Sequence, residues 1–505
     1  MGKLRREAME LREPLLPASV LVQMLTPLAP NEWDLAKAAH LLNRAGFGGT
    51  PAEIEALHQA GFENAVEKIL NAPDDSAAFP KPDWAVPQDM EGMQMAMRKL
   101  PENERREKMQ AERKSKMEQL FGLVDWWLDR MRKSPNQLRE KMTFFWHGHF
   151  ATSVLKVREP FGLWQQNETL RQNALGNFAT MTKAIARDPA MIFYLDTQQN
   201  HKNHPNENFA RELMELFTLG IGNYSEEDIQ QAARTFTCYK INPRTMSFQY
   251  MDYERDDGEK KFFGRTGNFS ADDVIDLILG KAACAKHIAK KLWTFFAYED
   301  PAPSLVGQLA DTFRGNFYGI RPLMREILRS AEFYSPAAMR SQIKSPVQWF
   351  VQTARQLDVD LPRGQAANNA LRALGQVPFF PPSVKGWDGG RAWINASTLL
   401  LRYNMAGYVA NGTQIGMGRM IANGAQRDGA KPGGPDLAKL APPELRANPK
   451  ALIETLGFRL FQTKLTPKET EVFLKFLDGQ HGDTGDQTIR GLLHLMMSTP
   501  EFQLT

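Results

Sequence analysis

The sequence predicts an all-α fold: a large multi-helix domain with a small β-hairpin insertion and a long charged helical arm. Two observations predict this fold class. Helix-start signals recur along the chain, each with a hydroxyl at the N-cap position and a carboxylate three residues later. They begin at Thr50, Ser225, Ser270 and Thr466. Alternation of apolar and polar residues, which marks half-buried strands, is scarce, so most of the core is expected to be helical.

Length, charge and cysteine content exclude several classes of protein. The chain has 505 residues, enough for one large domain or two to three smaller ones. The net charge of +4 is spread over 62 basic and 58 acidic residues, so no basic face for nucleic acid is expected. Two cysteines cannot build a disulfide framework or a thiolate zinc site. Any metal site must therefore use His, Asp or Glu.

Composition also predicts the domain organisation. One segment rich in Glu, Lys, Arg and Met predicts an exposed helical arm or, alternatively, an arm that binds a partner. A strand candidate followed by a turn-like Asp-Asp-Gly predicts the hairpin, and a segment rich in Gly, Pro, Ala and Asn predicts a linker or mobile loop. The expected order is an N-terminal extension (1–30), a main helical domain (31–411) that includes the arm (91–119) and the hairpin (245–264), a linker or mobile loop (412–444), and a C-terminal helical segment packed on the main domain (445–505).

The N-terminus bears on location. No apolar run approaches the roughly 20 residues that span a bilayer, so no transmembrane segment is expected. Lys3, Arg5 and Arg6 precede an apolar stretch at 15–28, as in a secretion signal. However, acidic residues such as Glu10 intervene and no clear small-residue cleavage site follows. The N-terminus therefore favours a cytoplasmic location slightly, with export to the periplasm as the alternative.

The densest polar chemistry lies between residues 200 and 220, beside apolar residues at helical spacing. Glu207, Arg211 and Glu215 follow one another four residues apart, which predicts one helical stripe with an arginine held between two carboxylates. On that interpretation the segment is a structural ion-pair network.

The same segment has a functional interpretation. Glu212 lies outside the stripe, so the ion-pair network explains its presence less well than that of Glu207 and Glu215. Glu212 or Glu215 would act as a metal ligand or general base, with Arg211 orienting it. Asn206 is a candidate binding residue in the same segment.

A His-x-His pair, His147 and His149, lies among aromatic residues at 144–150. In an extended segment both imidazoles would point the same way, as metal sites require, whereas on a helix they would diverge. Gly148 favours a helix end, which leaves convergence open. The alternative is that each histidine satisfies buried backbone at the end of an aromatic helix.

Residues 379–395 form the third constellation, with two prolines, three glycines and two tryptophans around several charged residues. Such a loop can wall a pocket, with Trp387 as a stacking surface and Lys385 and Arg391 as polar contacts. The alternative is a rigid aromatic loop that plugs the core. The loop lacks the strand and helix context of a phosphate-binding loop.

These segments together resemble one bacterial family. Its characteristic motifs match His40–Gly48, Phe145–Phe150, Asn206–Leu213, Pro381–Trp387 and Ser498–Phe502. The chain resembles the bacterial domain-of-unknown-function family 1800 over nearly its whole length. The resemblance implies a large, mostly helical protein and transfers no established activity. It also implies a sulfatase-like partner encoded nearby, and many members are exported.

The chain departs from the family pattern at two positions. The family commonly has Gly-Trp where this chain has Cys238-Tyr239, and it often has His-Asp where this chain has Arg255-Asp256. If that histidine served a metal in the family, Arg255 could not, so this position supports no shared metal site here.

Two function hypotheses follow. The first is an enzyme with a divalent metal ion, which would be zinc, iron or manganese. The metal is held by His147, His149 and carboxylates among Glu207, Glu212 and Glu215. It would activate water or polarise a substrate oxygen. The second is a non-catalytic scaffold or accessory protein, in which the same residues form a buried polar network and the arm binds a partner. The sequence favours the enzyme slightly and leaves the substrate and the oligomeric state open.

Overall fold

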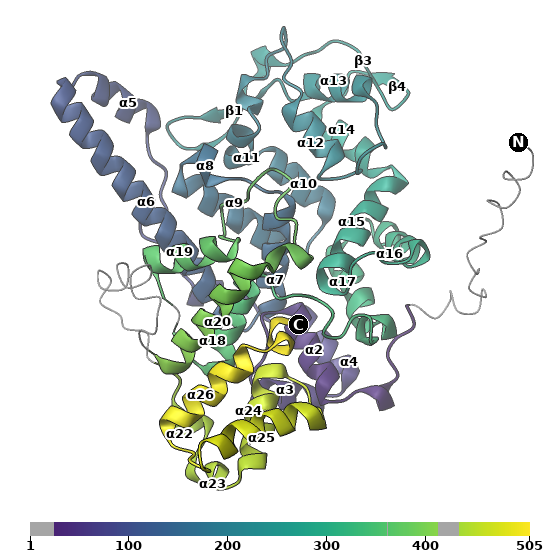
Figure 1. Ribbon diagram of the computed structural model, residues 1–505. Coiled ribbons are helices and arrows are strands. Elements are labelled where there is room, and N and C mark those ends of the chain that lie inside the picture. Colours follow the sequence, from purple (N-terminus) through teal and green to yellow (C-terminus); the bar gives the residue numbers. More distant parts are fainter. Residues whose placement is uncertain (1–24, 361, 413–433) are drawn as a thin grey trace, which may run out of the picture.

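The computed structural model describes residues 25–360, 362–412 and 434–505, and it is predominantly helical (Figure 1). The predicted all-α fold class is confirmed. Most of the predicted N-terminal extension and most of the predicted linker lie outside the described residues. Within the described parts, no helix is both long and apolar enough to cross a membrane.

The first half of the chain contains an N-terminal helical group, a projecting pair of helices and a central group. These helices are α2 (Leu35–Ala45), α3 (Pro51–Gln59), α4 (Phe62–Leu70), α5 (Met90–Arg98), α6 (Glu102–Lys133), α7 (Gln137–His149), α8 (Val154–Val157), α9 (Pro160–Asn173), α10 (Phe178–Ala186), α11 (Pro189–Tyr194), α12 (Asn208–Glu215) and α13 (Glu226–Thr235).

Two hairpins precede the second half, which is again helical. Its helices are α14 (Ala271–Leu279), α15 (Ala282–Phe296), α16 (Pro303–Gly315), α17 (Ile320–Arg329), α18 (Pro346–Leu357), α19 (Gly364–Leu374), α20 (Ala396–Asn411), α22 (Leu437–Leu440), α23 (Pro443–Arg446), α24 (Pro449–Phe461), α25 (Pro467–Gly479) and α26 (Asp486–Met497). The C-terminal helices lie against the N-terminal group (Figure 1), where the Gln462 amide donates to the Gly49 carbonyl.

The four predicted helix starts are confirmed. Thr50, Ser225, Ser270 and Thr466 each cap a helix with a complete capping box, in which the hydroxyl and the carboxylate three residues later satisfy each other's backbone N–H groups. These signals depend on a few adjacent residues, which explains why the sequence alone reveals them.

The hairpin region differs from the prediction of one hairpin. Two separate antiparallel pairs form, β1 (Tyr239–Asn242) with β2 (Ser247–Tyr250) and β3 (Lys260–Phe262) with β4 (Arg265–Gly267). The acidic turn expected within the hairpin instead joins the two pairs. Asp256 accepts hydrogen bonds from the Arg234 guanidinium of α13, with Nε at 2.7 Å, which holds this connection onto the helical body.

The helical arm consists of two helices, α5 and the first half of α6, and projects from the body (Figure 1). Its residues from Glu102 to Ala111 are exposed, and α6 becomes buried from Leu120 onward. The Arg244–Glu91 ion pair, 2.8 Å, joins the arm to the turn between β1 and β2.

Two large hydrophobic clusters form the core, and α7 lies between them. Met142, Phe145 and Trp146 belong to the first cluster, whereas Phe144 belongs to the second. Because α7 packs on both sides, its C-terminal end, which carries the two predicted histidines, is held rigidly in the middle of the molecule.

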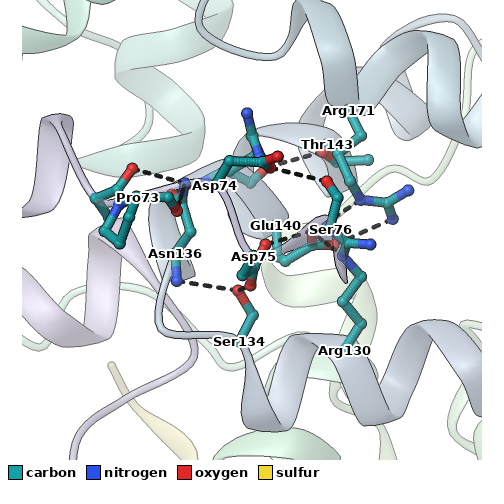
Figure 2. A network of polar contacts seen from close by, with 12 residues as sticks. Pro73, Asp74, Asp75, Ser76, Arg130, Ser134, Asn136, Glu140, Thr143 and Arg171 are labelled. Carbon is teal, nitrogen blue, oxygen red and sulfur yellow. Dashed lines mark hydrogen bonds and ion pairs between the residues drawn. The ribbon is translucent and has the colours of Figure 1, made fainter. Parts of the chain in front are cut away.

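A buried ion-pair network holds the other end of α7 (Figure 2). The fully buried Glu140 carboxylate accepts from Arg130 Nε at 2.7 Å and Arg171 Nε at 2.8 Å, while Asp75 pairs with Arg130 at 3.2 Å. Burial opposes ionisation of Glu140, but the guanidiniums of Arg171 and Arg130 hold its pKa below the ordinary value. The network therefore ties α6, α7 and α9 together.

Candidate functional site

The three predicted constellations converge at the C-terminal end of α7. His149 Nε2 lies 3.0 Å from the carbonyl oxygen of Phe217, just after α12. Gly386, in the loop after α19, packs so closely on α7 that an added Cβ would overlap the carbonyl oxygen of Gly148. The structure thus brings the histidine pair, the polar helix and the aromatic loop together.

His147 has a structural partner. Its Nε2 accepts a hydrogen bond from the backbone N–H of Phe379 at 2.9 Å, so the Nε2 lone pair is already used. The ring packs against Trp127, Phe379 and Trp387. Burial lowers the pKa of His147 to about 3, so the ring is neutral.

His149 is satisfied at one nitrogen only. Because its Nε2 faces a carbonyl oxygen, Nε2 carries the proton and donates, and Nδ1 carries a lone pair. Nδ1 is buried and has no hydrogen-bond partner among the described residues. Burial, together with the charges of Lys291 and His287, lowers the pKa of His149 well below its ordinary value. His149 is therefore a neutral ring with one free, buried acceptor.

The predicted ion-pair stripe on α12 is half correct. Arg211 pairs with Glu207 at 3.0 Å, but its second partner is Glu226 at 2.8 Å. Glu215 instead accepts from the Tyr224 hydroxyl at 2.8 Å. The chain turns back after α12 and places the start of α13 beside Arg211, so a carboxylate from another helix replaces the one expected from helical spacing.

Glu212 is unpaired, as the sequence pattern suggested. It is partly buried, and its carboxylate makes no hydrogen bond or ion pair within the described part of the chain. Burial and the neighbouring Glu215 charge raise the pKa of Glu212, while Arg211 lowers it. The Glu212 charge also contributes to the raised pKa of Tyr194, after burial, which places the two side chains near each other.

The predicted metal ligands are not assembled as a cluster. Across the described ranges, no group of three or more His, Cys, Asp or Glu residues is arranged to hold a metal ion. The contacts above supply the reason, since the His147 lone pair accepts from a backbone amide and Glu207 and Glu215 have other partners.

This geometry predicts the outcome of a metal test. Elemental analysis of the native protein is expected to find no stoichiometric zinc, iron or manganese, and adding these ions is expected to leave the Tm unchanged. The opposite result, one bound metal ion per protein that is lost in His149→Ala, would support the hypothesis of a metal-dependent enzyme.

The remaining predicted binding residues have separate positions. Asn206 accepts from the backbone N–H of Asn208 at 3.0 Å and so helps to start α12. Lys385 is exposed and pairs with Asp388 at 2.8 Å. Trp387 is partly buried beside His147, whereas Arg391 is exposed in a short 3-10 helix. Of these residues, Lys385 and Trp387 lie at the C-terminal end of α7, because Gly386 between them packs on Gly148.

Sequence reasoning missed two residues of α15. His287 Nε2 lies 3.1 Å from the carbonyl oxygen of Leu216, beside the Phe217 carbonyl that His149 contacts. Lys291 is partly buried, and within the described ranges its ammonium group makes no hydrogen bond or ion pair. Burial and the nearby charge of Lys385 lower the pKa of Lys291 to about 8.

A signal for these residues is present in the sequence. His287, Lys291 and Phe295 lie four residues apart, so they share one face of a helix. The Phe295 ring lies 5.1 Å from that of Phe145, so this face is directed at α7. The position of Lys291 on the same helix face as His287 and Phe295 is the pattern that could have identified the site.

We refer to His149, His287, Lys291 and Lys385 as the α7–α15 site. The two imidazoles are bound to backbone carbonyls, which leaves the Lys291 ammonium and the His149 Nδ1 lone pair available. Chemically, the site offers a cationic donor and a neutral acceptor, with a second cation in Lys385.

Comparison with known proteins identifies the family. The family model described as Protein of unknown function (DUF1800) matches residues 40–504. No curated protein and no solved structure matches the chain. Because the family match includes every residue of the α7–α15 site and nearly the whole chain, the protein belongs to the DUF1800 family.

Proposed function

We propose that the protein binds a small anionic substrate, carrying a carboxylate or phosphate group, at the α7–α15 site. The observation that carries the proposal is that a partly buried Lys291 ammonium and the buried His149 Nδ1 both lack a protein partner among the described residues. Leaving a partly buried charge and a buried acceptor without partners costs free energy. Functional sites retain such groups because a ligand supplies the missing partner.

The charges around the site favour an anion. Lys385 acts on Lys291 from the loop after α19, whereas His287 is neutral because burial lowers its pKa to about 4. Lys291 makes no contact with a carboxylate within the described part of the chain. An anionic group between Lys291 and Lys385 would neutralise their mutual repulsion. His149 Nδ1 would accept a hydrogen bond from a neighbouring hydroxyl or amine of the same ligand.

A second candidate function, an accessory role, is supported by the arm. The exposed methionines Met95, Met109 and Met117 lie on α5 and α6, and such flexible apolar side chains suit protein contacts. The sulfatase-like partner implied by the family resemblance would be the protein to test against this arm.

Anion binding is tested by thermal unfolding in the presence of inorganic phosphate or pyruvate at constant ionic strength. A ligand at about 100 times its Kd is expected to add about 2.7 kcal/mol to the free energy of unfolding. Lys291→Met is expected to abolish this stabilisation. The matched control is Lys286→Met, an exposed lysine of the same helix, which should retain it. No stabilisation by either anion, or equal loss in both variants, would contradict the proposed function.

A further inference from the structure

We propose that Lys291 is a nucleophile that forms an imine with the carbonyl carbon of a small 2-oxo acid. This inference rests on the proposed function and specifies its substrate class. A 2-oxo acid combines an anionic carboxylate with an electrophilic carbonyl group, and the α7–α15 site offers a partner for each.

The position of Lys291 separates it from the other lysines of α15. Lys286 and Lys290 are exposed, as is the N-cap residue Lys281, whereas Lys291 is partly buried on the helix face that carries His287 and Phe295. Within the described ranges its ammonium has no acceptor, so no ion pair needs to break before it reacts. A lysine next to another cation in a desolvated position is the recognised setting of an activated amine.

Burial and the positive charge of Lys385 favour the neutral form of Lys291. His149 from α7, His287 from α15 and Lys385 from the loop after α19 are the titratable groups that interact with it, and Lys385 is itself paired with Asp388. With a pKa of about 8, about a tenth of Lys291 is neutral at pH 7, against roughly one in 3,000 for a lysine at its ordinary value.

The reaction balances without an oxidant or a reductant. The neutral Nζ lone pair attacks the carbonyl carbon, and the carbonyl π electrons move to oxygen and form a carbinolamine. One proton passes from the nitrogen to the oxygen and gives the neutral carbinolamine. The second nitrogen proton then passes to this hydroxyl group, which departs as water while the nitrogen lone pair forms the C=N bond. His149 Nδ1 stays neutral because its pKa is well below the ordinary value, so it orients the carbinolamine by accepting a hydrogen bond while solvent water carries the protons. Lys385 pairs with the carboxylate.

The test traps the imine in the full-length protein. Pyruvate is added with sodium cyanoborohydride, which reduces an imine to a stable amine, and peptide mass spectrometry then locates the modified lysines. Lys291 is expected to be modified at least about tenfold faster than Lys286 at pH 7, with a rate that rises through pH 8. Modification spread evenly over the lysines of α15 would overturn the inference.

A second variant tests the role of the neighbouring cation. Lys385→Met removes a positive charge, so the pKa of Lys291 is expected to rise and the midpoint of the pH profile for trapping to move above 8. Trapping with acetaldehyde, which has no carboxylate, should show the same shift but should be slower than trapping with pyruvate in the native protein. An unchanged pH profile in Lys385→Met, or equal rates with both carbonyl compounds, would count against the proposal.

The two proposals fail differently. If phosphate stabilises the protein through Lys291 but pyruvate is not trapped there, the imine inference is wrong and anion binding stands. If neither anion stabilises the protein and no selective trapping occurs, both are wrong.

Discussion

Glu140→Gln is expected to lower the free energy of unfolding by about 3 to 5 kcal/mol, the range found when one member of a buried ion pair is removed. The substitution keeps the size of the side chain but removes its charge. Arg130 and Arg171, both almost fully buried, would then keep only the carboxylates of Asp75 and Glu168, respectively. The amide nitrogen of glutamine would also face guanidinium donors where an oxygen now accepts.

Chemical denaturation measures this effect, and Glu168→Gln provides the control. Glu168 also pairs with Arg171, but its side chain is 21% exposed and Arg171 retains Glu140. Its replacement is therefore expected to cost about 1 kcal/mol or less. Similar losses in the two variants would show that the buried network contributes no more than a surface pair.

The contribution of Glu140 also depends on pH. Its pKa is lower in the folded protein than the ordinary 4.5, so the folded state binds fewer protons than the unfolded state in the range below 4.5. The stabilisation is complete above that value and declines as the pH falls toward the folded-state pKa. The difference between native protein and Glu140→Gln should accordingly shrink in acid.

Local sequence signals predicted the elements that depend on a few neighbouring residues. The capping boxes at Thr50, Ser225, Ser270 and Thr466 need only four residues each, and all four start a helix. The pairing of strands needs a register between distant residues. For that reason the sequence predicted one hairpin where two short ones form.

In the candidate site, too, local contacts were predicted from the sequence and long-range contacts were not. Helical spacing correctly joined Arg211 to Glu207, but the second acid, Glu226, comes from another helix. The sequence left two interpretations of His147 and His149 open, and tertiary packing places a backbone group, Phe379 N–H or the Phe217 carbonyl, at each ring. Sequence patterns identify the side chains that can hydrogen-bond or react. The backbone groups that become their partners come from segments distant in the sequence.

Lys291 marks the limit of sequence reasoning most clearly. The helical spacing of α15 places Lys291 on the face with His287 and Phe295, but it does not show that Lys291 is partly removed from solvent. Its position depends on the loop after α19, which passes over the end of α7 and brings Lys385 near. The properties of the site therefore depend on how closely that loop can approach α7.

Gly386→Ala is expected to disrupt this approach, with a loss of about 3 to 5 kcal/mol in the free energy of unfolding or a displaced loop. Gly386 has a φ of +86°, a conformation that disfavours any side chain, and its added Cβ would overlap the backbone oxygen of Gly148. The backbone of α7 cannot move away, because α7 is packed between both parts of the core.

Gly389→Ala in the same loop separates the two causes. Gly389 has a similar φ of +79°, but nothing lies within 4 Å of the position of its Cβ. It should lose only the conformational term of about 1 to 2 kcal/mol and should retain stabilisation by phosphate. Gly386→Ala should lose phosphate stabilisation, and the pH midpoint of Lys291 modification should move above 8 because Lys385 is displaced. If both variants behave alike, close packing of the loop on Gly148 does not create the site, and the low pKa of Lys291 must arise from burial within α15 alone.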